Sequence, residues 1–170
     1  TLQLRNTISW TALLSAYSDQ GFSEEALYCF EDMMLEGVCP DVVTYICSLK
    51  ACGSVGAIYK AQELHCEISK EELEEDPYVG NSLVDMYAKC GALKKAQEVL
   101  EELKNHDVVS WSTLIAGYAA NNQGHEALKL FACMQREGIS PNEVTFICVL
   151  KACGSIGAVD KGTQIHVHIM

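Results

Sequence analysis

The sequence repeats itself at a distance of 101 residues. Thr7–Ser69 aligns with Val108–Met170 without a gap, and 27 of the 63 aligned positions are identical. Unrelated segments would match at only about one position in fifteen to twenty, so the match is an internal repeat. Chains of this kind fold by stacking similar units, each of which contacts only its neighbours.

The repeated unit has the pattern of a helical hairpin. Within residues 108–142, apolar residues recur at the i, i+3, i+4 and i+7 spacing of one helix face, first at Trp111, Leu114, Ile115 and Tyr118 and then at Ala127, Leu128, Phe131 and Met134. Gly138 and Pro141 then predict the end of the second helix. A single hairpin cannot cover its own apolar face, so it requires neighbours.

Three hairpins fill one repeat. Their predicted bounds are 7–41, 42–76 and 77–107, which are 35, 35 and 31 residues long, and residues 108–142 and 143–170 begin the series again. We therefore predict an all-α fold in which helix-turn-helix units stack into an α-solenoid. Residues 1–6 resemble the tail of an earlier hairpin and Met170 stops partway through a helix, so we expect an excerpt from a longer array.

Composition narrows the class of protein. No apolar run reaches the ~18–20 residues of a membrane span, so we expect no membrane partner. The nine cysteines form no CxxC pair. Because Cys47, Cys52, Cys148 and Cys153 lie on or beside predicted apolar faces, we interpret them as reduced, buried thiols, with zinc sites or disulfides as alternatives.

The formal net charge is −11, which argues against a non-specific nucleic-acid binder. Much of the excess comes from Glu67–Asp76, where six acids accompany one lysine. We interpret this run as a solvated helix end, and we expect weak electrostatic attraction of the whole chain to phosphate.

Three motif types resemble one known family. VVSWSTLIAGYA with EALKLFACMQREGISPN resembles a P motif, VTFICVLKACGSIGAVDKGTQIHVHI an L motif and VGNSLVDMYAKCGALKKAQEVL an S motif of the pentatricopeptide-repeat family, in its plant organellar PLS class. The resemblance implies a right-handed α-solenoid. It divides the chain into the tail of an S motif (1–6), a P motif (7–41), an L motif (42–76), an S motif (77–107), a P motif (108–142) and a partial L motif (143–170).

The resemblance also implies a reader of single-stranded RNA that takes about one base per repeat. In the family, the fifth and last residues of a motif read the base. Here these pairs are Thr11 with Asp41, which favours guanine, Asn81 with Asp107, which favours uracil over cytosine, and Ser112 with Asn142, which favours adenine. The second residues, which hold the base between them, are Ile8, Val43, Tyr78, Val109 and Val144.

The L motifs are expected to read weakly or not at all. Their fifth residues are Ile46 and Ile147, whose aliphatic side chains cannot hydrogen-bond a base, and Ile46 is paired with Asp76. The implied ligand is therefore 5′-G-N-U/C-A-N-3′.

Structural explanations compete with these assignments. Asp41, Asp107 and Asn142 could serve only as helix N-caps, and the four aliphatic second residues could simply be buried. Trp10 and Trp111 are expected in the core, and His65 and His166 are expected to be packed.

The turn after the first L motif departs from the family. Glu72 and Glu75 stand where a glycine and a proline are usual, which favours a second helix that continues past Lys70 and shifts Asp76. This departure bears most directly on the assignment of Asn81 with Asp107.

The function expected from the resemblance is RNA recognition. We expect a module of a mitochondrial or chloroplast RNA-processing factor, of the kind that acts in C-to-U editing, with accessory editing-factor proteins binding through L motifs. We find no catalytic constellation, metal motif or cofactor loop, and expect no enzyme. A helical scaffold for a basic protein partner and a structural fragment without a ligand are the alternatives.

Overall fold

A computed structural model describes residues 6–104 and 106–169, without the side chains of residues 168 and 169. This part of the chain forms ten α-helices and one 3₁₀ helix, and none of its residues lies in a strand. The elements are α1 (Thr7–Asp19), α2 (Ser23–Leu35), α3 (Val42–Val55), α4 (Ile58–Lys70), η1 (Leu73–Glu75), α5 (Pro77–Lys89), α6 (Leu93–Glu102), α7 (Val108–Ala120), α8 (Gly124–Arg136), α9 (Glu143–Ser155) and α10 (Val159–Ile169).

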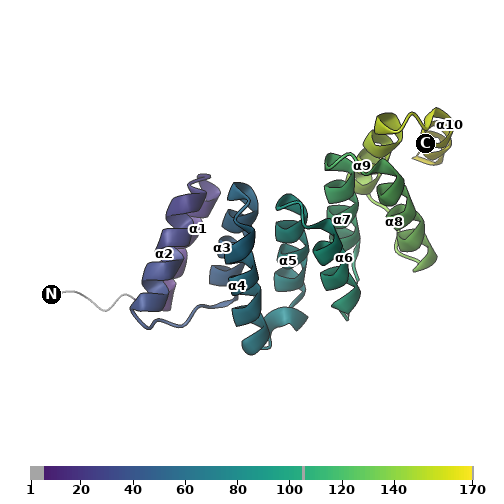
Figure 1. Cartoon of the computed structure of the whole chain (residues 1–170). Helices are drawn as coiled ribbons and strands as arrows, with labels where there is room; N and C mark the ends of the chain where they lie inside the picture. Colours follow the sequence, from purple (N-terminus) through teal and green to yellow (C-terminus); the bar gives the residue numbers. More distant parts are fainter. Residues whose placement is uncertain (1–5, 105, 170) are drawn as a thin grey trace.

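The helices form the predicted right-handed α-solenoid. In Figure 1 the helical hairpins stand side by side in chain order, from α1 and α2 near one end to α9 and α10 at the other. The first helices of successive hairpins (α1, α3, α5, α7 and α9) pack against one another in an unbroken row. The second helix of each hairpin covers one side of this row. Trp10 and Trp111 are buried in the resulting core, as predicted.

Side-chain caps fix where the first helices begin. Asp41, Asp107 and Asn142 each accept a hydrogen bond from the backbone N–H three residues on, within a reciprocal capping box. Pro77 occupies the first turn of α5, where its missing N–H costs nothing. Gly138 follows α8 with a φ of 77°, the left-handed conformation expected after a helix end.

The expectation that the helix before Asp76 continues past Lys70 is wrong. α4 ends at Lys70, and Glu72 adopts a φ of 56° before the short helix η1. Contacts from α4 hold η1 in place, because Glu74 accepts from the Ser69 hydroxyl and lies 3.1 Å from His65 Nε2. Asp76 thus caps α5 through the backbone N–H groups of Tyr78 and Val79.

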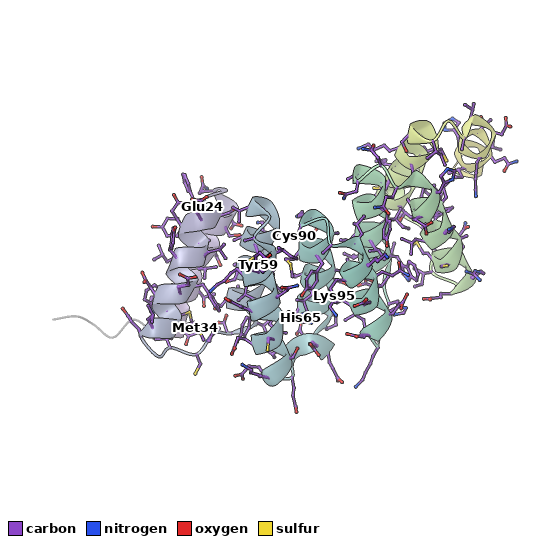
Figure 2. All side chains as sticks on the ribbon, viewed as in Figure 1. Glu24, Met34, Tyr59, His65, Cys90 and Lys95 are labelled. Atoms are coloured by element: carbon purple, nitrogen blue, oxygen red, sulfur yellow. The ribbon has the colours of Figure 1, made fainter. Side chains whose placement is uncertain are left out.

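The two histidines expected to be packed behave differently. His65 is half-buried on α4 (Figure 2). Its Nδ1 lies 2.9 Å from the Tyr87 hydroxyl of α5. Burial lowers the pKa of His65, with Glu74 acting in the opposite direction. His166 is exposed, so the expectation for it is wrong: within the described residues, no later helix covers that part of α10.

The thiols expected to lie near apolar faces are free. Cys52 and Cys153 are buried, whereas Cys47 and Cys148 are half-buried. Burial raises the pKa of Cys52 to about 12, so this thiol stays protonated at neutral pH. Among the described helices, none combines the length and apolar character required to cross a bilayer.

Candidate functional site

The residues expected to read bases gather at the starts of the first helices. Each fifth residue lies in the second turn of one first helix, and its partner caps the next first helix in the row. Side-by-side packing of α1 with α3, α5 with α7 and α7 with α9 therefore brings together residues about 26–30 positions apart.

At the junction of α1 and α3, Thr11 and Asp41 share a third residue. The Thr11 hydroxyl lies 2.9 Å from the Thr44 hydroxyl and 3.4 Å from both carboxylate oxygens of Asp41. The Thr44 hydroxyl in turn donates to Asp41 Oδ1 at 2.7 Å. Thr44 is buried, whereas Asp41 is exposed.

The junction of α7 and α9 has the same arrangement, with Asn142 in place of the aspartate. Ser112 Oγ lies 2.6 Å from Thr145 Oγ1, which donates to Asn142 Oδ1 at 2.9 Å. Ser112 is only 3% exposed, so it lies at the floor of the site, whereas Asn142 is exposed at its edge.

At the junction of α5 and α7 the two predicted residues contact each other directly. Asn81 Nδ2 donates to Asp107 Oδ2 at 3.3 Å. Partial burial acts to raise the pKa of Asp107, but hydrogen bonds from the Ser110 backbone N–H and from Asn81 outweigh it and lower this pKa below its ordinary value.

The second residues form a row of exposed apolar side chains. Their exposed fractions are 76% for Ile8, 49% for Val43, 73% for Tyr78, 52% for Val109 and 54% for Val144. The alternative that the aliphatic members are simply buried core is therefore wrong. An isolated exposed valine needs no explanation, but recurrence at one position of five hairpins does.

Two hollows lie between these exposed side chains. The α5–α7 hollow, of about 600 Å³, is lined by Tyr78 and Val109 and by the pair Asn81 and Asp107. The α7–α9 hollow, of about 530 Å³, is lined by Val109 and Val144 and by the pair Ser112 and Asn142. Val109 therefore lines both hollows, and each hollow combines apolar side chains with one pair of side chains that can form hydrogen bonds.

The L-motif positions differ from these pairs. Ile46 is half-buried and lines the α5–α7 hollow, and Ile147 is 53% exposed. Neither side chain can donate or accept a hydrogen bond. Asp76 Oδ1 is engaged in capping α5.

Sequence reasoning missed the charged lining of both hollows. Lys89 and Asp85 line both, and Lys50 lines the α5–α7 hollow. Lys89 pairs with Asp85 at 2.6 Å and Lys50 with Asp19 at 3.2 Å. The signal was present, because residues 81, 85 and 89 follow one another at i, i+4 and i+8 on one helix face.

The arrangement suits a flat ligand with a hydrogen-bonding edge. Apolar walls on either side can contact both faces of a planar ring, while the pair between them meets its edge. Nearby lysines can neutralise an anionic backbone. Among the side chains that the structure describes, no group of three or more from His, Cys, Asp or Glu is arranged to hold a metal ion.

Comparison with known families gives consistent matches along the chain. The model of the PPR repeat family matches residues 5–54 and 106–155, and that of the PPR repeat matches residues 81–108. A mitochondrial pentatricopeptide repeat-containing protein of Arabidopsis thaliana is 39% identical over 157 residues, or 92% of this chain. A chloroplastic one from the same plant is 39% identical over 162 residues, or 95% of the chain. The chain spans only 17% and 26% of the lengths of these relatives.

Solved structures share the fold. The pentatricopeptide repeat protein PPR10 from maize, in complex with an 18-nt psaJ RNA element, superimposes with a TM-score of 0.78 at 21% identity. The match covers 95% of this chain and 24% of PPR10. Nuclear proteinaceous RNase P 2 of A. thaliana matches with a TM-score of 0.72 at 14% identity, over 97% of this chain and 38% of that protein.

Proposed function

The chain belongs to the PPR repeat family, and on this premise we propose that it is a sequence-specific, single-stranded RNA-binding module that reads about one base per repeat. The observation that carries the proposal is the pair of adjacent hollows that share Val109 as a wall. Each has apolar side chains on two sides and a hydrogen-bonding pair between them. This is what a stacked base with a readable edge requires.

The proposed ligand is 5′-G-N-U/C-A-N-3′, read by motifs with the bounds 7–41, 42–76, 77–107, 108–142 and 143–170. Thr11 with Asp41 would take guanine, Asn81 with Asp107 uracil before cytosine, and Ser112 with Asn142 adenine. Asp107 accepts the N3–H of uracil while Asn81 donates to a carbonyl oxygen. The two L motifs contribute spacing, because Ile46 and Ile147 offer a base no hydrogen bond.

The cellular setting follows from the relatives. Several curated relatives are mitochondrial or chloroplastic proteins, so we propose that this chain acts in one of these organelles. We further propose that it belongs to the PLS class and directs an RNA-processing factor, of the C-to-U editing kind, to its site. In this proposal the chain supplies RNA recognition. Catalysis and the accessory editing factors are supplied by other proteins or protein domains.

A titration with two RNAs tests the proposal. Fluorescence anisotropy at low salt compares an RNA that contains 5′-GNUAN with one that contains 5′-ANGGN, using this chain within its flanking repeats. A good base contact discriminates by about 1–3 kcal/mol, so three changed positions give a preference well above tenfold for the first RNA. Equal affinity, or binding to neither, would contradict base reading.

The second candidate is a scaffold for a basic protein partner. A hollow of about 480 Å³ between α2 and α4 has an apolar lining that includes Phe30 and Met34. Its charged lining consists of Glu31, Glu63, Glu67 and Lys60, and Lys60 pairs with Glu31 and Glu63. Three carboxylates against one lysine leave this lining net acidic, which favours a cationic amphipathic segment. This candidate gains support if the titration shows no base preference.

A further inference from the structure

We propose that Thr145, which belongs to none of the three predicted reading pairs, determines specificity at the α7–α9 hollow by fixing the direction of the hydrogen bonds that link Ser112 to Asn142. The inference deepens the proposed function and rests on it. Thr145 is a positioning residue, because it is buried and acts through the two side chains that face the hollow.

The direction of each hydrogen bond follows from the number of protons that each group can donate. The Asn142 amide is oriented by the Thr145 backbone N–H, which donates to Oδ1 at 2.9 Å. The Thr145 hydroxyl donates its only proton to the same oxygen. It accepts from the Asn142 backbone N–H at 3.1 Å and, at 2.6 Å, from Ser112, which must therefore be the donor.

The direction of these hydrogen bonds determines which donor and acceptor atoms remain available to a ligand in the hollow. Asn142 has its oxygen turned inward and presents the N–H groups of Nδ2 to the hollow. Ser112 has its proton turned toward Thr145 and presents only a lone pair. The site thus offers an acceptor beside a donor.

That pattern separates the four bases into two classes. Adenine has an N6 amino donor beside the N1 acceptor, and cytosine has an N4 donor beside the N3 acceptor. Guanine and uracil have a carbonyl oxygen beside an N–H, which is the reverse order. The pair Ser112 and Asn142, ordered by Thr145, therefore accepts amino bases and rejects keto bases.

The junction of α1 and α3 provides an internal comparison. Thr44 donates to Asp41 and accepts from Thr11 in the same way. A carboxylate, however, presents an acceptor whichever oxygen is turned outward, and Thr11 has Asp41 as a second acceptor at 3.4 Å. Guanine, with its adjacent N1–H and N2–H donors, fits two acceptors. The preference at this junction should therefore survive the loss of the threonine hydroxyl.

The junction of α5 and α7 provides a second comparison. Ser110 occupies the same capping position, and its hydroxyl bonds to the main-chain N–H and carbonyl of Asp107 and also interacts with the Asp107 carboxyl group. Asn81 donates directly to the carboxylate. Ser110→Ala removes a capping hydroxyl, but the Asp107 carboxylate can only accept and Asn81 still donates to it, so the proton order of the reading pair stays the same.

The test uses the ¹⁵N-labelled chain and four RNAs, 5′-GCUXC-3′, in which X is A, C, G or U. NMR titration measures the weak affinities expected from few repeats, and the Asn142 side-chain amide signals report the site itself. The unmodified chain should bind the A and C forms about tenfold more tightly than the G and U forms. Thr145→Val should reduce this ratio to below about threefold, while Thr145→Ser, which keeps the hydroxyl, should retain it.

Two variants serve as matched controls, each tested at its own RNA position. Thr44→Val should keep the preference for guanine at the first position, and Ser110→Ala should keep the preference for uracil at the third. Backbone ¹H–¹⁵N spectra confirm that each variant remains folded.

The outcomes separate the two proposals. If the unmodified chain discriminates between bases at X and Thr145→Val does so equally well, the role of Thr145 is overturned while base reading stands. If the unmodified chain binds all four RNAs equally, base reading fails and the role of Thr145 fails with it.

Discussion

At the scale of single residues, the proposed reading side chains have two functions. Asp41, Asp107 and Asn142 each cap a first helix and also border the surface on which a base would lie. An N-cap contributes about 1 kcal/mol to stability, so replacing one of these residues changes folding as well as recognition. The fifth residues carry no capping function and are better targets for changing specificity.

Thr11→Asn should move the preference at the first RNA position from guanine to uracil. The change recreates the pair of Asn81 with Asp107, in which an amide donor beside a carboxylate acceptor matches the carbonyl and N–H of uracil. Titration with RNAs that differ only at the first base measures the shift, which we expect to exceed tenfold.

Ala12→Asn is the control for this change, because Ala12 is exposed one position further along α1. It should leave the preference for guanine in place. A preference that Thr11→Asn does not alter would remove Thr11 from the reading residues.

The cap formed by Asp107 should depend on pH. Its pKa is lowered in the folded chain, so its stabilising contribution is complete above the ordinary carboxyl pKa of about 3.9 and is lost as the pH falls through the lower, folded value. Because Asp107 is exposed, solvent screening keeps this contribution at about 1 kcal/mol or less. Urea unfolding between pH 7 and pH 2.5 measures it.

Asp107→Asn keeps a capping side chain but does not titrate, so it isolates the effect from the other carboxylates. The stability advantage of the unmodified chain over this variant should shrink as the pH falls. An advantage that stays constant across the range would show that the hydrogen bonds do not stabilise the ionised form of Asp107.

At the scale of helices, close approach of α5 and α7 sets the geometry of the hollows. A Cβ atom added at Gly117 of α7 would lie 2.7 Å from the Cβ of Ala88 of α5, which belongs to the helix backbone frame and cannot rotate away. Both residues line the α7–α9 hollow. Only a glycine at position 117 allows the two helices to keep their present separation.

Gly117→Ala should therefore destabilise the chain by about 1–3 kcal/mol, the usual cost of overpacking. Gly154→Ala is the matched control, because a Cβ there meets nothing within 4 Å and α9 has ordinary helical backbone at this position. It should stabilise the chain by about 0.5–1 kcal/mol. Urea unfolding measures the free energy of unfolding of both variants. If both substitutions changed this free energy equally, the close approach of α5 and α7 at Gly117 would be contradicted.

The helices and their caps could be predicted from local sequence because their signals are local. Spacing places Trp111 in the core, and Asp41 and Asn142 precede apolar periodic runs as caps usually do. The end of α4 could not be predicted in this way. It depends on a left-handed Glu72 and on contacts of Glu74 with α4, which the residue types alone do not indicate.

The candidate site, too, could be predicted from the sequence only in part. The fifth and last residues were found by motif register, and the packing of successive first helices brings them together. The burial of Ser112 and its link to Thr145 depend on how closely α7 and α9 pack, a distance that no spacing rule supplies. The exposure of the second residues was likewise undecided, because a valine in a first turn fits either a core or a surface.

At the scale of the whole molecule, charge is distributed unevenly. The net charge is −11, and the densest acidic run lies at the end of α4, in η1 and before α5. The hollows between the first helices have a balanced charged lining instead, in which Lys50 and Lys89 accompany Asp85 and Asp107. RNA binding should therefore depend on these local cations rather than on long-range attraction to the molecule as a whole.

This distribution predicts a shallow salt dependence. Each phosphate contact on a single strand changes the slope of log K against log salt by about −0.7, so two lysines that contact phosphate give about −1.4. Lys89→Gln should weaken binding to every RNA by a similar factor and make the slope less steep by about 0.7, leaving base preference unchanged. Lys129→Gln is the control, since Lys129 is an exposed, ion-paired lysine of α8 that is not part of either hollow's lining. If both variants made the salt dependence less steep by the same amount, RNA binding would depend on the net electrostatic potential of the whole chain. It would not depend on the lysines that line the hollows.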